Sequence, residues 1–260
     1  MPDSGIDPGD VMPVLLHYLD VVDSTNLYAV KHFDALADGT LVAAGAQSAG
    51  RGRLGRVWVS PEGVNIYATL VVKTPGMPFL AGAVVGLAGI RLVRELLPET
   101  AVFLKWPNDI YCGHRKLAGI LCEGAGFQAG QLRGVAAGIG ININLERSVL
   151  NQLDQPAVSL AELAGRTFDM PEVLTLFAEL TADVYTLYRE DPAELFRQWK
   201  AENRLIGHEV SFVAPDGNIF RGVFEDIASS GEMQLLLPDG SRKTVNCGDV
   251  RIQRDSLPSF

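Results

Sequence analysis

The chain has little cysteine and no long apolar run. Its 260 residues include three cysteines, and none of them forms a C-x-x-C pair. So few cysteines cannot make a disulfide framework and are typical of a reducing cytoplasm, so we interpret Cys112, Cys122 and Cys247 as small core residues. The most apolar stretch, residues 80–90, is far shorter than the roughly 20 residues that cross a bilayer. The sequence therefore predicts a cytoplasmic protein without a membrane partner.

Positive charge is also scarce. The chain has 22 Lys and Arg against 31 Asp and Glu, which gives a formal net charge of −9. This excess of acid argues against a broad basic face for nucleic acid or anionic membrane, but it leaves room for a local basic site. The first twenty residues contain four aspartates and no lysine or arginine, so they lack the basic start of a secretory signal. We therefore predict no DNA partner.

The order of the expected elements indicates two domains. Short apolar runs and helical segments alternate up to about residue 203, and after Gly207 the pattern changes to short strands between turn residues. We predict domains at residues 1–206 and 207–260, the second a small SH3-like β-barrel docked on the first, because so short a segment is marginal alone. The expected strands are 14–22, 41–46, 57–60, 66–73, 102–106, 110–112, 116–123, 135–145, 209–214, 219–227, 232–237 and 242–246, and the expected helical segments are 79–97 and 158–203.

Polar residues begin a further expected helix near the start of the chain. Residues 23–26 read Asp-Ser-Thr-Asn, and side-chain oxygens of this kind accept hydrogen bonds from the first N–H groups of a helix. An apolar residue then recurs at near-helical spacing. We expect the buried face of this helix to carry Leu27, Val30, Phe33 and Leu36.

A loop at residues 50–56 is rich in arginine and glycine. It contains a G-x-G-x-x-G pattern, but a strand-like segment follows where a dinucleotide site needs an apolar helix, and the chain has no P-loop motif. Arginine binds phosphate or carboxylate through two parallel hydrogen bonds, and Arg51, Arg53 and Arg56 lie within this loop. The loop therefore predicts an anion site; the alternative is a solvated surface turn.

Three other features are unusual for a plain sheet. Residues 105–109 read Lys-Trp-Pro-Asn-Asp, which is either a β-turn or a turn that directs amide and carboxylate groups to one side. Lys116 heads an apolar strand, where a lysine either pairs with an anion or reaches water at the strand end. Gly138 and Gly140 weaken a strand unless something approaches its backbone or it packs tightly on helix 79–97. Together with the loop, these features indicate a nucleotide and a small carboxylate as ligands.

The same residues form a set of motifs in a fixed order. They are residues 23–26, Gln47 with 50–61, Asn-Ile-Tyr at 65–67, Lys-Trp-Pro-Asn-Asp at 105–109, Lys-Leu-Ala-Gly-Ile-Leu-x-Glu at 116–123 and Gly-Ile-Gly-Ile-Asn at 138–142. This set resembles the biotin–protein ligases over about residues 14–144. The resemblance implies an α+β catalytic domain with a mixed sheet, similar to class II aminoacyl-tRNA synthetases, and a small SH3-like β-barrel after it. It also implies that biotin and MgATP form biotinyl-5'-AMP, which a lysine of a biotin carboxyl carrier protein domain then attacks.

The resemblance implies roles for individual residues. The residues implied to contact biotin or its adenylate are Ser24, Thr25, Asn26, Gln47, Arg51, Gly52, Arg53, Lys116 and Gly119, and those implied to bind the nucleotide are Arg56, Lys105, Asn108 and Asn142. Arg56 would also help order the loop, and Asp109 would bind Mg²⁺ near the ATP phosphates. Lys116 and Arg53 are the expected catalytic residues. A cation about 4 Å from each of two mutually repelling anions recovers about 4 kcal/mol per contact at an effective dielectric near 20.

Two other functions fit parts of this pattern. A lipoate–protein ligase shares the catalytic fold and the adenylation chemistry, although the arginine-glycine loop and residues 105–109 favour biotin. A non-catalytic module that binds phosphate or RNA is disfavoured by the charge of −9. Some biotin–protein ligases carry an N-terminal DNA-binding helix-turn-helix. Because only about 13 residues precede the first expected strand, we predict a ligase that is not a repressor.

Overall fold

The structure is a computed structural model that describes residues 14–73, 78–128, 131–214, 217–246 and 249–251. Its larger part contains strands and helices in alternation. The strands are β1 (Leu16–Val22), β2 (Leu41–Gln47), β3 (Ile66–Val72), β4 (Val102–Lys105), β5 (Asp109–Cys112), β6 (Arg115–Gln128) and β7 (Gln131–Ile141). The helices are α1 (Thr25–Lys31), α2 (Pro78–Leu96), α3 (Arg147–Leu150), α4 (Leu160–Ala164), α5 (Met170–Glu190) and α6 (Pro192–Ala201).

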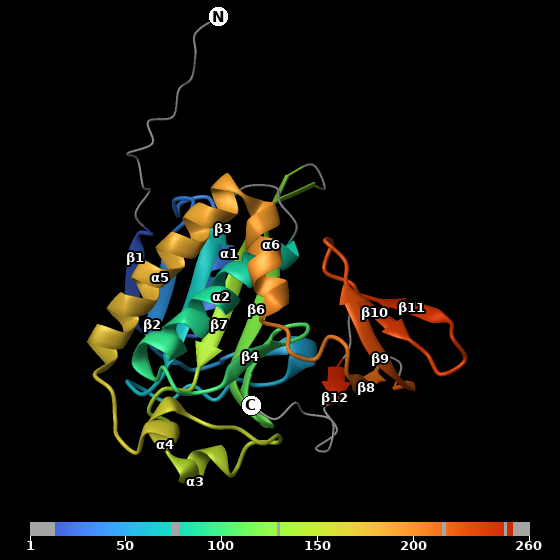
Figure 1. Cartoon of the computed structure of the whole chain (residues 1–260). Coiled ribbons are helices and arrows are strands. Elements are labelled where there is room, and N and C mark those ends of the chain that lie inside the picture. Colours follow the sequence, from blue (N-terminus) through green and yellow to red (C-terminus); the bar gives the residue numbers. More distant parts are fainter. Residues whose placement is uncertain (1–13, 74–77, 129–130, 215–216, 247–248, 252–260) are drawn as a thin grey trace, which may run out of the picture.

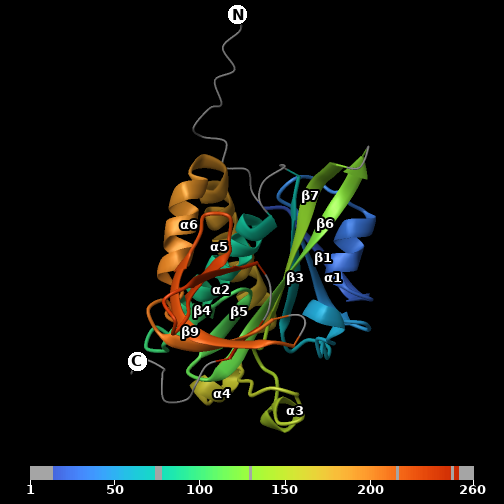
Figure 2. The ribbon, with the colours of Figure 1, turned by 90° about the vertical axis from the view of Figure 1, so that its right-hand side faces the viewer.

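The seven strands form one mixed sheet in the order β1-β2-β3-β7-β6-β5-β4. Strands β1 and β2 run parallel, and the other neighbours are antiparallel. Helices α2, α5 and α6 cover one face of this sheet, and α1 lies on the opposite face (Figures 1 and 2). This arrangement confirms the predicted α+β class with a mixed sheet.

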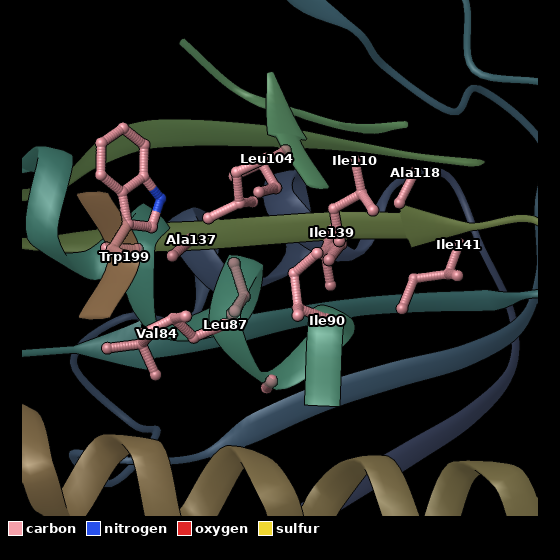
Figure 3. Packing of buried hydrophobic residues seen from close by; sticks show 14 of the residues in the cluster. Val84, Leu87, Ile90, Leu104, Ile110, Ala118, Ala137, Ile139, Ile141 and Trp199 are labelled. Atoms are coloured by element: carbon pink, nitrogen blue, oxygen red, sulfur yellow. The ribbon is translucent and has the colours of Figure 1, made fainter. Parts of the chain in front are cut away.

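Helix α2 packs directly on the sheet through apolar side chains. Figure 3 shows Val84, Leu87 and Ile90 of this helix against Ile139 and Ile141 of β7. Alternate residues of a strand point to opposite faces, so the intervening glycines of β7 face away from α2. The explanation of Gly138 and Gly140 by tight packing on this helix is therefore wrong. Their Cβ positions are instead filled by side chains of the α1 side, Asn26 and Trp58.

Helix α1 begins as the sequence predicts, but its buried face matches the expected one only in part. Ser24 is its N-cap, and its hydroxyl accepts from the N–H of Leu27 at 3.5 Å. The helix ends at Lys31, so Leu36 lies beyond it, and Leu27 is 39% exposed. Thr25 and Asn26 of this helix line a polar pocket, whereas Ala29 packs in a small apolar cluster with Phe33, and Val30 and Leu36 pack against that cluster.

The second sheet is built from five short strands. They are β8 (Glu209–Val213), β9 (Ile219–Ile227), β10 (Met233–Leu236), β11 (Arg242–Val245) and β12 (Asp249–Arg251), in the order β11-β10-β9-β8-β12. The sequence predicted all but β12, whose three residues are too few to show a periodic pattern. The antiparallel strands lie beside the larger part in Figure 1 and confirm the predicted small β domain. The boundary at residues 206 and 207 stays a prediction.

Trp106 joins the two parts. Its indole N–H donates to the carbonyl oxygen of Gly231 at 2.9 Å, and its ring centroid lies 6.4 Å from that of Phe212 and 6.5 Å from that of Phe224. Because Trp106 is fully buried and belongs to the Lys-Trp-Pro-Asn-Asp turn, the small domain packs directly behind a predicted functional segment. The expectation of a docked domain is confirmed. In the described ranges, no helix is both long enough and apolar enough to cross a membrane.

Candidate active site

A cavity of about 690 Å³ brings most of the predicted site residues together. Arg51, Arg53 and Lys116 all line it, so the three cations share one space, as the electrostatic argument requires. The other predicted residues in its wall are Gly52, Arg56, Asn108, Asp109, Gly119 and Asn142. Ser24, Thr25, Asn26 and Gln47 line a smaller adjacent cavity, and Lys105 lines a third.

Lys116 points into the large cavity because strand β6 is irregular at its start. Ala118 pairs with Ile110 and Lys116 pairs with Tyr111, so Leu117 is an extra residue in the β6 strand. A bulge of this kind re-aims a side chain to the other face of a sheet. Lys116 thus lies on the same side as Gly119, although a regular strand would put residues three apart on opposite faces.

The Lys116 ammonium is held by an anion and an aromatic ring. Its Nζ lies 2.7 Å from Asp109 Oδ1 and 5.5 Å from the ring centroid of Trp58. The side chain is only 12% exposed, so the counter-anion interpretation is confirmed over the alternative in which the lysine reaches water. Its backbone is fixed as well, because its N–H donates to Pro156 O and its carbonyl oxygen accepts from Val158 N, both at 2.9 Å.

Two glycines make room for these groups. Gly119 on β6 lies directly opposite Gly140 on β7. A Cβ on Gly119 would lie 3.1 Å from Lys116 Nζ and 3.0 Å from the Trp58 ring, and one on Gly140 would collide with the Trp58 indole. The glycines are therefore needed because Trp58 lies flat against the backbone of both strands. Among the residues that the structure describes, the buried Trp58 N–H has no acceptor.

The arginine-glycine loop is a compact turn. Residues Arg53–Gly55 form one turn of 3₁₀ helix, closed by a bond from Gly52 N to Arg56 O at 2.8 Å. The strand expected at residues 57–60 is wrong: Val57 makes a single bridge to Arg51. The segment mainly folds back on its own loop, because Trp58 N donates to Gly50 O at 3.0 Å, and it meets the sheet only at its end, where Gln47 N donates to Ser60 O at 3.3 Å.

Arg53 contacts the Lys-Trp-Pro-Asn-Asp turn. Its Nη1 donates to Asn108 Oδ1 at 2.7 Å, and Asn108 Nδ2 donates to Ile120 O at the same distance. Asn108 therefore fixes an arginine with one end of its amide and the β6 backbone with the other. The turn directs polar groups to one side, as one of the two interpretations of this turn predicts.

The small cavity, of about 30 Å³, is surrounded by a buried polar network. Gln47 Oε1 accepts from Thr25 N at 2.9 Å, and Gln47 Nε2 donates to Ser60 Oγ at 2.9 Å. Sequence reasoning missed Thr69, whose hydroxyl lies 2.9 Å from Thr25 Oγ1 and 2.7 Å from Asn26 Oδ1. A single threonine within the otherwise apolar, fully buried strand β3 was the available signal.

The third cavity, of about 230 Å³, is lined mainly by α2, β4, β6 and the turn at residues 105–109. Lys105 lines it with Arg53, and Lys105 Nζ is 4.0 Å from Asp109 Oδ2 and 4.9 Å from the Tyr111 ring centroid. The C-terminal domain contributes Asn246 to the wall. Nothing in the sequence singled out Asn246, because an asparagine after a short strand is ordinary turn chemistry. Cys122 lines the same cavity, where burial raises the pKa of its thiol to about 12.

The surroundings of Asp109 bear on the expected Mg²⁺. Its carboxylate has lysine ammonium groups at 2.7 and 4.0 Å, which compensate its charge. In the part of the chain that the structure covers, no three His, Cys, Asp or Glu side chains gather as a metal site. Mg²⁺ binds one or two carboxylates together with substrate phosphates and water, so these residues suit an ion that arrives with ATP better than one held by the protein. Metal binding by Asp109 stays a prediction.

Comparison with known proteins assigns the chain to a family. Residues 18–142 match the Biotin/lipoate A/B protein ligase family, and residues 205–252 match the Biotin protein ligase C terminal domain. The biotin–[acetyl-CoA-carboxylase] ligase of Paracoccus denitrificans is 33% identical over 241 residues, which cover 88% of this chain and 96% of that protein. This chain belongs to the biotin–protein ligases.

Other members of the family agree with this assignment. The bifunctional ligase/repressor BirA of Salmonella typhimurium is 33% identical over 254 residues, 96% of this chain and 76% of that protein. The biotin protein ligase of Aquifex aeolicus, solved in complex with biotin and ATP, superposes with a TM-score of 0.75 at 26% identity and covers 91% of this chain and 97% of its own. The expected absence of a repressor domain concerns residues 1–13, which lie outside the described residues, and it stays a prediction.

Proposed function

We propose that this chain activates biotin with ATP to biotinyl-5'-AMP and transfers the biotinyl group to a lysine of a biotin carboxyl carrier protein domain. One observation carries the proposal: Arg51, Arg53 and Lys116 line one cavity next to a small polar pocket. The cations of the large cavity allow two anions, a carboxylate and a phosphate, to meet there. The small pocket suits the uncharged, hydrogen-bonding ring system of biotin. The proposed location is the cytoplasm.

The small cavity is the proposed site of the biotin ring system. Ser24, Thr25, Asn26 and Gln47 present hydroxyl and amide groups there, and all are fixed by α1, β2 and their hydrogen bonds. Buried polar groups of this kind reject ligands that leave them unpaired, so the pocket discriminates by hydrogen bonding. Lipoate has no ureido group to pair with them, which is the physical reason to favour biotin over lipoate.

The first reaction joins a carboxylate to a phosphate. A carboxylate oxygen of biotin attacks the α-phosphorus of ATP, a new P–O bond forms, and pyrophosphate leaves with the electrons of the broken bond. Arg51 lines both cavities, and Lys116 lines the large one beside Gly119, which also lines both, so the two cations can offset the repulsion between the reacting anions. Because Lys116 is already fixed by Asp109 and Trp58, its charge needs no reorganisation during the reaction.

The nucleotide is proposed to occupy the rest of the large cavity. Asn142 and the apolar side chains of Leu145 and Leu153 also line this cavity, a mixture that suits adenine. Lys105 and Arg53 in the adjoining third cavity are proposed to receive the β- and γ-phosphates and then the pyrophosphate. The Mg²⁺ that accompanies ATP neutralises part of the phosphate charge.

In the second reaction, the lysine amine of the carrier domain attacks the carbonyl carbon of the mixed anhydride. An amide bond forms, AMP leaves with the electrons of the broken C–O bond, and the amine loses a proton. Until then the adenylate must be kept from water. The arginine-glycine loop and Trp58 line the large cavity, and we propose that they keep water away from the adenylate.

Exchange of labelled pyrophosphate into ATP tests the proposal directly. The purified chain should catalyse exchange that depends on biotin and should not respond to lipoate. Exchange that is stimulated by lipoate and not by biotin would show that the chain is a lipoate–protein ligase instead. No adenylate formation with biotin at saturating MgATP would favour a non-catalytic binding module.

A further inference from the structure

We propose that Glu123 is a positioning residue that holds the arginine-glycine loop closed over the small cavity. Its carboxylate bridges the loop and the pocket wall: Oε1 lies 3.0 Å from Arg51 Nη2, and Oε2 accepts from Asn26 Nδ2 at 3.1 Å. Neither the family resemblance nor the reaction steps above give Glu123 a role. The inference rests on the proposed function, because it concerns how biotin is retained.

The wall side of this bridge is rigid. Asn26 Nδ2 also donates to Leu121 O at 2.9 Å, and Asn26 Oδ1 lies 2.7 Å from the Thr69 hydroxyl. Its amide fills the space where a Cβ on Gly138 would be, so that strand cannot carry a larger residue there. Asn26 is buried, and Glu123, at 23% exposure, is thereby fixed by a group that has little freedom to move.

The loop side is more exposed and strained. Arg51 is 45% exposed, and Leu54 adopts a left-handed backbone conformation (φ 55°), which leucine rarely does. A loop with a strained residue and few buried contacts needs an anchor to stay in one conformation. The Arg51–Glu123 ion pair provides that anchor on the side of the small cavity.

The size of the small cavity shows why the loop must move. Its volume of about 30 Å³ is a small fraction of the about 690 Å³ of the large cavity, too little for a bicyclic ring to enter as the wall stands. Arg51 and Trp58 form part of its wall, and both lie in or next to the loop. Biotin therefore enters after these residues move outward, and it is retained when they return. Glu123 stabilises the returned position.

The Glu123→Gln variant tests this inference. Glutamine keeps the size and an acceptor for Asn26 but loses the charge that holds Arg51. We expect biotin to dissociate about fivefold faster and its KM to rise by a similar factor, the size expected for one partly exposed ion pair, with the KM for ATP and the kcat at saturating biotin unchanged. Trypsin should cut the free variant faster within residues 51–56, and biotin should restore protection.

A matched control separates this effect from a general loss of charge. Glu225→Gln removes an ion pair with Arg242 at 2.6 Å in the C-terminal domain and should change none of these quantities. Glu123→Asp keeps the charge but is too short to reach Arg51 and Asn26 together. We therefore expect a biotin dissociation rate between those of the wild type and Glu123→Gln. The aspartate variant also serves as the test if the glutamine variant does not fold.

The outcomes distinguish this inference from the function beneath it. If the wild-type chain binds biotin and both folded Glu123 variants release it at the wild-type rate, the positioning role is wrong and the function stands. If the wild-type chain binds no biotin, the proposed function itself fails.

Discussion

At the scale of single residues, the site is a set of cations that already have partners. Lys116 pairs with Asp109, Arg51 with Glu123, and Arg53 with the amide of Asn108. These partners fix the directions of the positive groups when the loop is closed. Preorganised charge of this kind lowers the barrier to a reaction between anions, because the protein does not reorient during the reaction.

The first prediction concerns Lys116. The Lys116→Ala variant should keep its fold, because Asp109 retains Lys105 at 4.0 Å, yet it should lose about 10² to 10³ in the rate of adenylate formation. Single-turnover formation of biotinyl-5'-AMP measures this. Lys200→Ala, which removes a lysine paired with Asp226 away from the cavities, is the control and should be fully active. Wild-type adenylation in the Lys116 variant would remove this residue from the mechanism.

The second prediction concerns Cys122. Burial, with a smaller contribution from the nearby charge of Glu123, raises the pKa of its thiol to about 12. The thiolate is the nucleophile, so at pH 8 about one thiol in 10⁴ is reactive. Iodoacetamide should therefore label Cys122 far more slowly than a free cysteine, with the rate rising steadily between pH 8 and 11, as mass spectrometry of the peptide would show. Rapid labelling at pH 8 would contradict a raised thiol pKa at this partly buried position.

At the scale of elements, the site depends on strand positions that carry no side chain. Gly138, Gly140 and Gly119 leave room on one face of the sheet for Asn26, Trp58 and Lys116. The isoleucines of β7 that alternate with these glycines, at positions 139 and 141, pack on α2. The same strand thus serves the core with one face and the site with the other. This division follows from the two-residue period of a strand.

The third prediction follows from Gly140. In the Gly140→Ala variant, the new methyl group collides with the Trp58 indole, so the ring must leave its place beside Lys116. We expect the KM for biotin to rise at least tenfold and stability to fall by about 1–3 kcal/mol, the usual effect of overpacking. Steady-state kinetics and thermal unfolding measure the two effects.

A second glycine supplies the control. Gly165 ends α4 with a φ of 65°, and a Cβ there meets open space. Gly165→Ala should cost about 1 kcal/mol of stability through backbone strain and leave the KM for biotin unchanged. An unchanged KM for biotin in Gly140→Ala would show that biotin binding does not depend on the observed position of Trp58.

Sequence patterns predicted most helices and strands but not the direction in which every side chain points. The strands β1 to β7 and the helix α2 appear near their expected residues because their apolar periods are clear. The bulge at Leu117 was not predictable, since regular spacing would separate Lys116 from Gly119. Residues 57–60 have strand-like composition, but the loop before them closes through Gly52 and Arg56, and that tertiary contact overrides local preference.

At the scale of the whole molecule, the C-terminal domain borders the cavity that is proposed to receive the phosphates. Trp106 ties the Lys-Trp-Pro-Asn-Asp turn to Gly231, and Asn246 reaches the cavity that Lys105 and Arg53 share. The chain has a net charge of −9, yet Lys105 and Arg53 share one cavity, to whose wall the C-terminal domain adds Asn246. The sequence could predict a docked barrel, but not which of its residues faces the site, because docking geometry leaves no periodic signal.

The fourth prediction tests that contact. Asn246→Ala should raise the KM for ATP about three- to tenfold, the cost of losing one hydrogen bond to a charged group, and leave the KM for biotin unchanged. Gln234→Ala, on β10 of the same domain and outside the cavity wall, is the matched control. Equal ATP kinetics in both variants would restrict the role of the C-terminal domain to support of the turn.

The central claim is that clustered cations let the carboxylate of biotin react with the α-phosphate of ATP. Mass spectrometry of the chain under non-denaturing conditions, after incubation with biotin and MgATP, tests it most directly. The account predicts a tightly held adduct with the mass of biotinyl-5'-AMP, absent when either substrate is omitted and strongly reduced in Lys116→Ala. A chain that binds biotin and ATP separately but forms no adenylate would contradict the account.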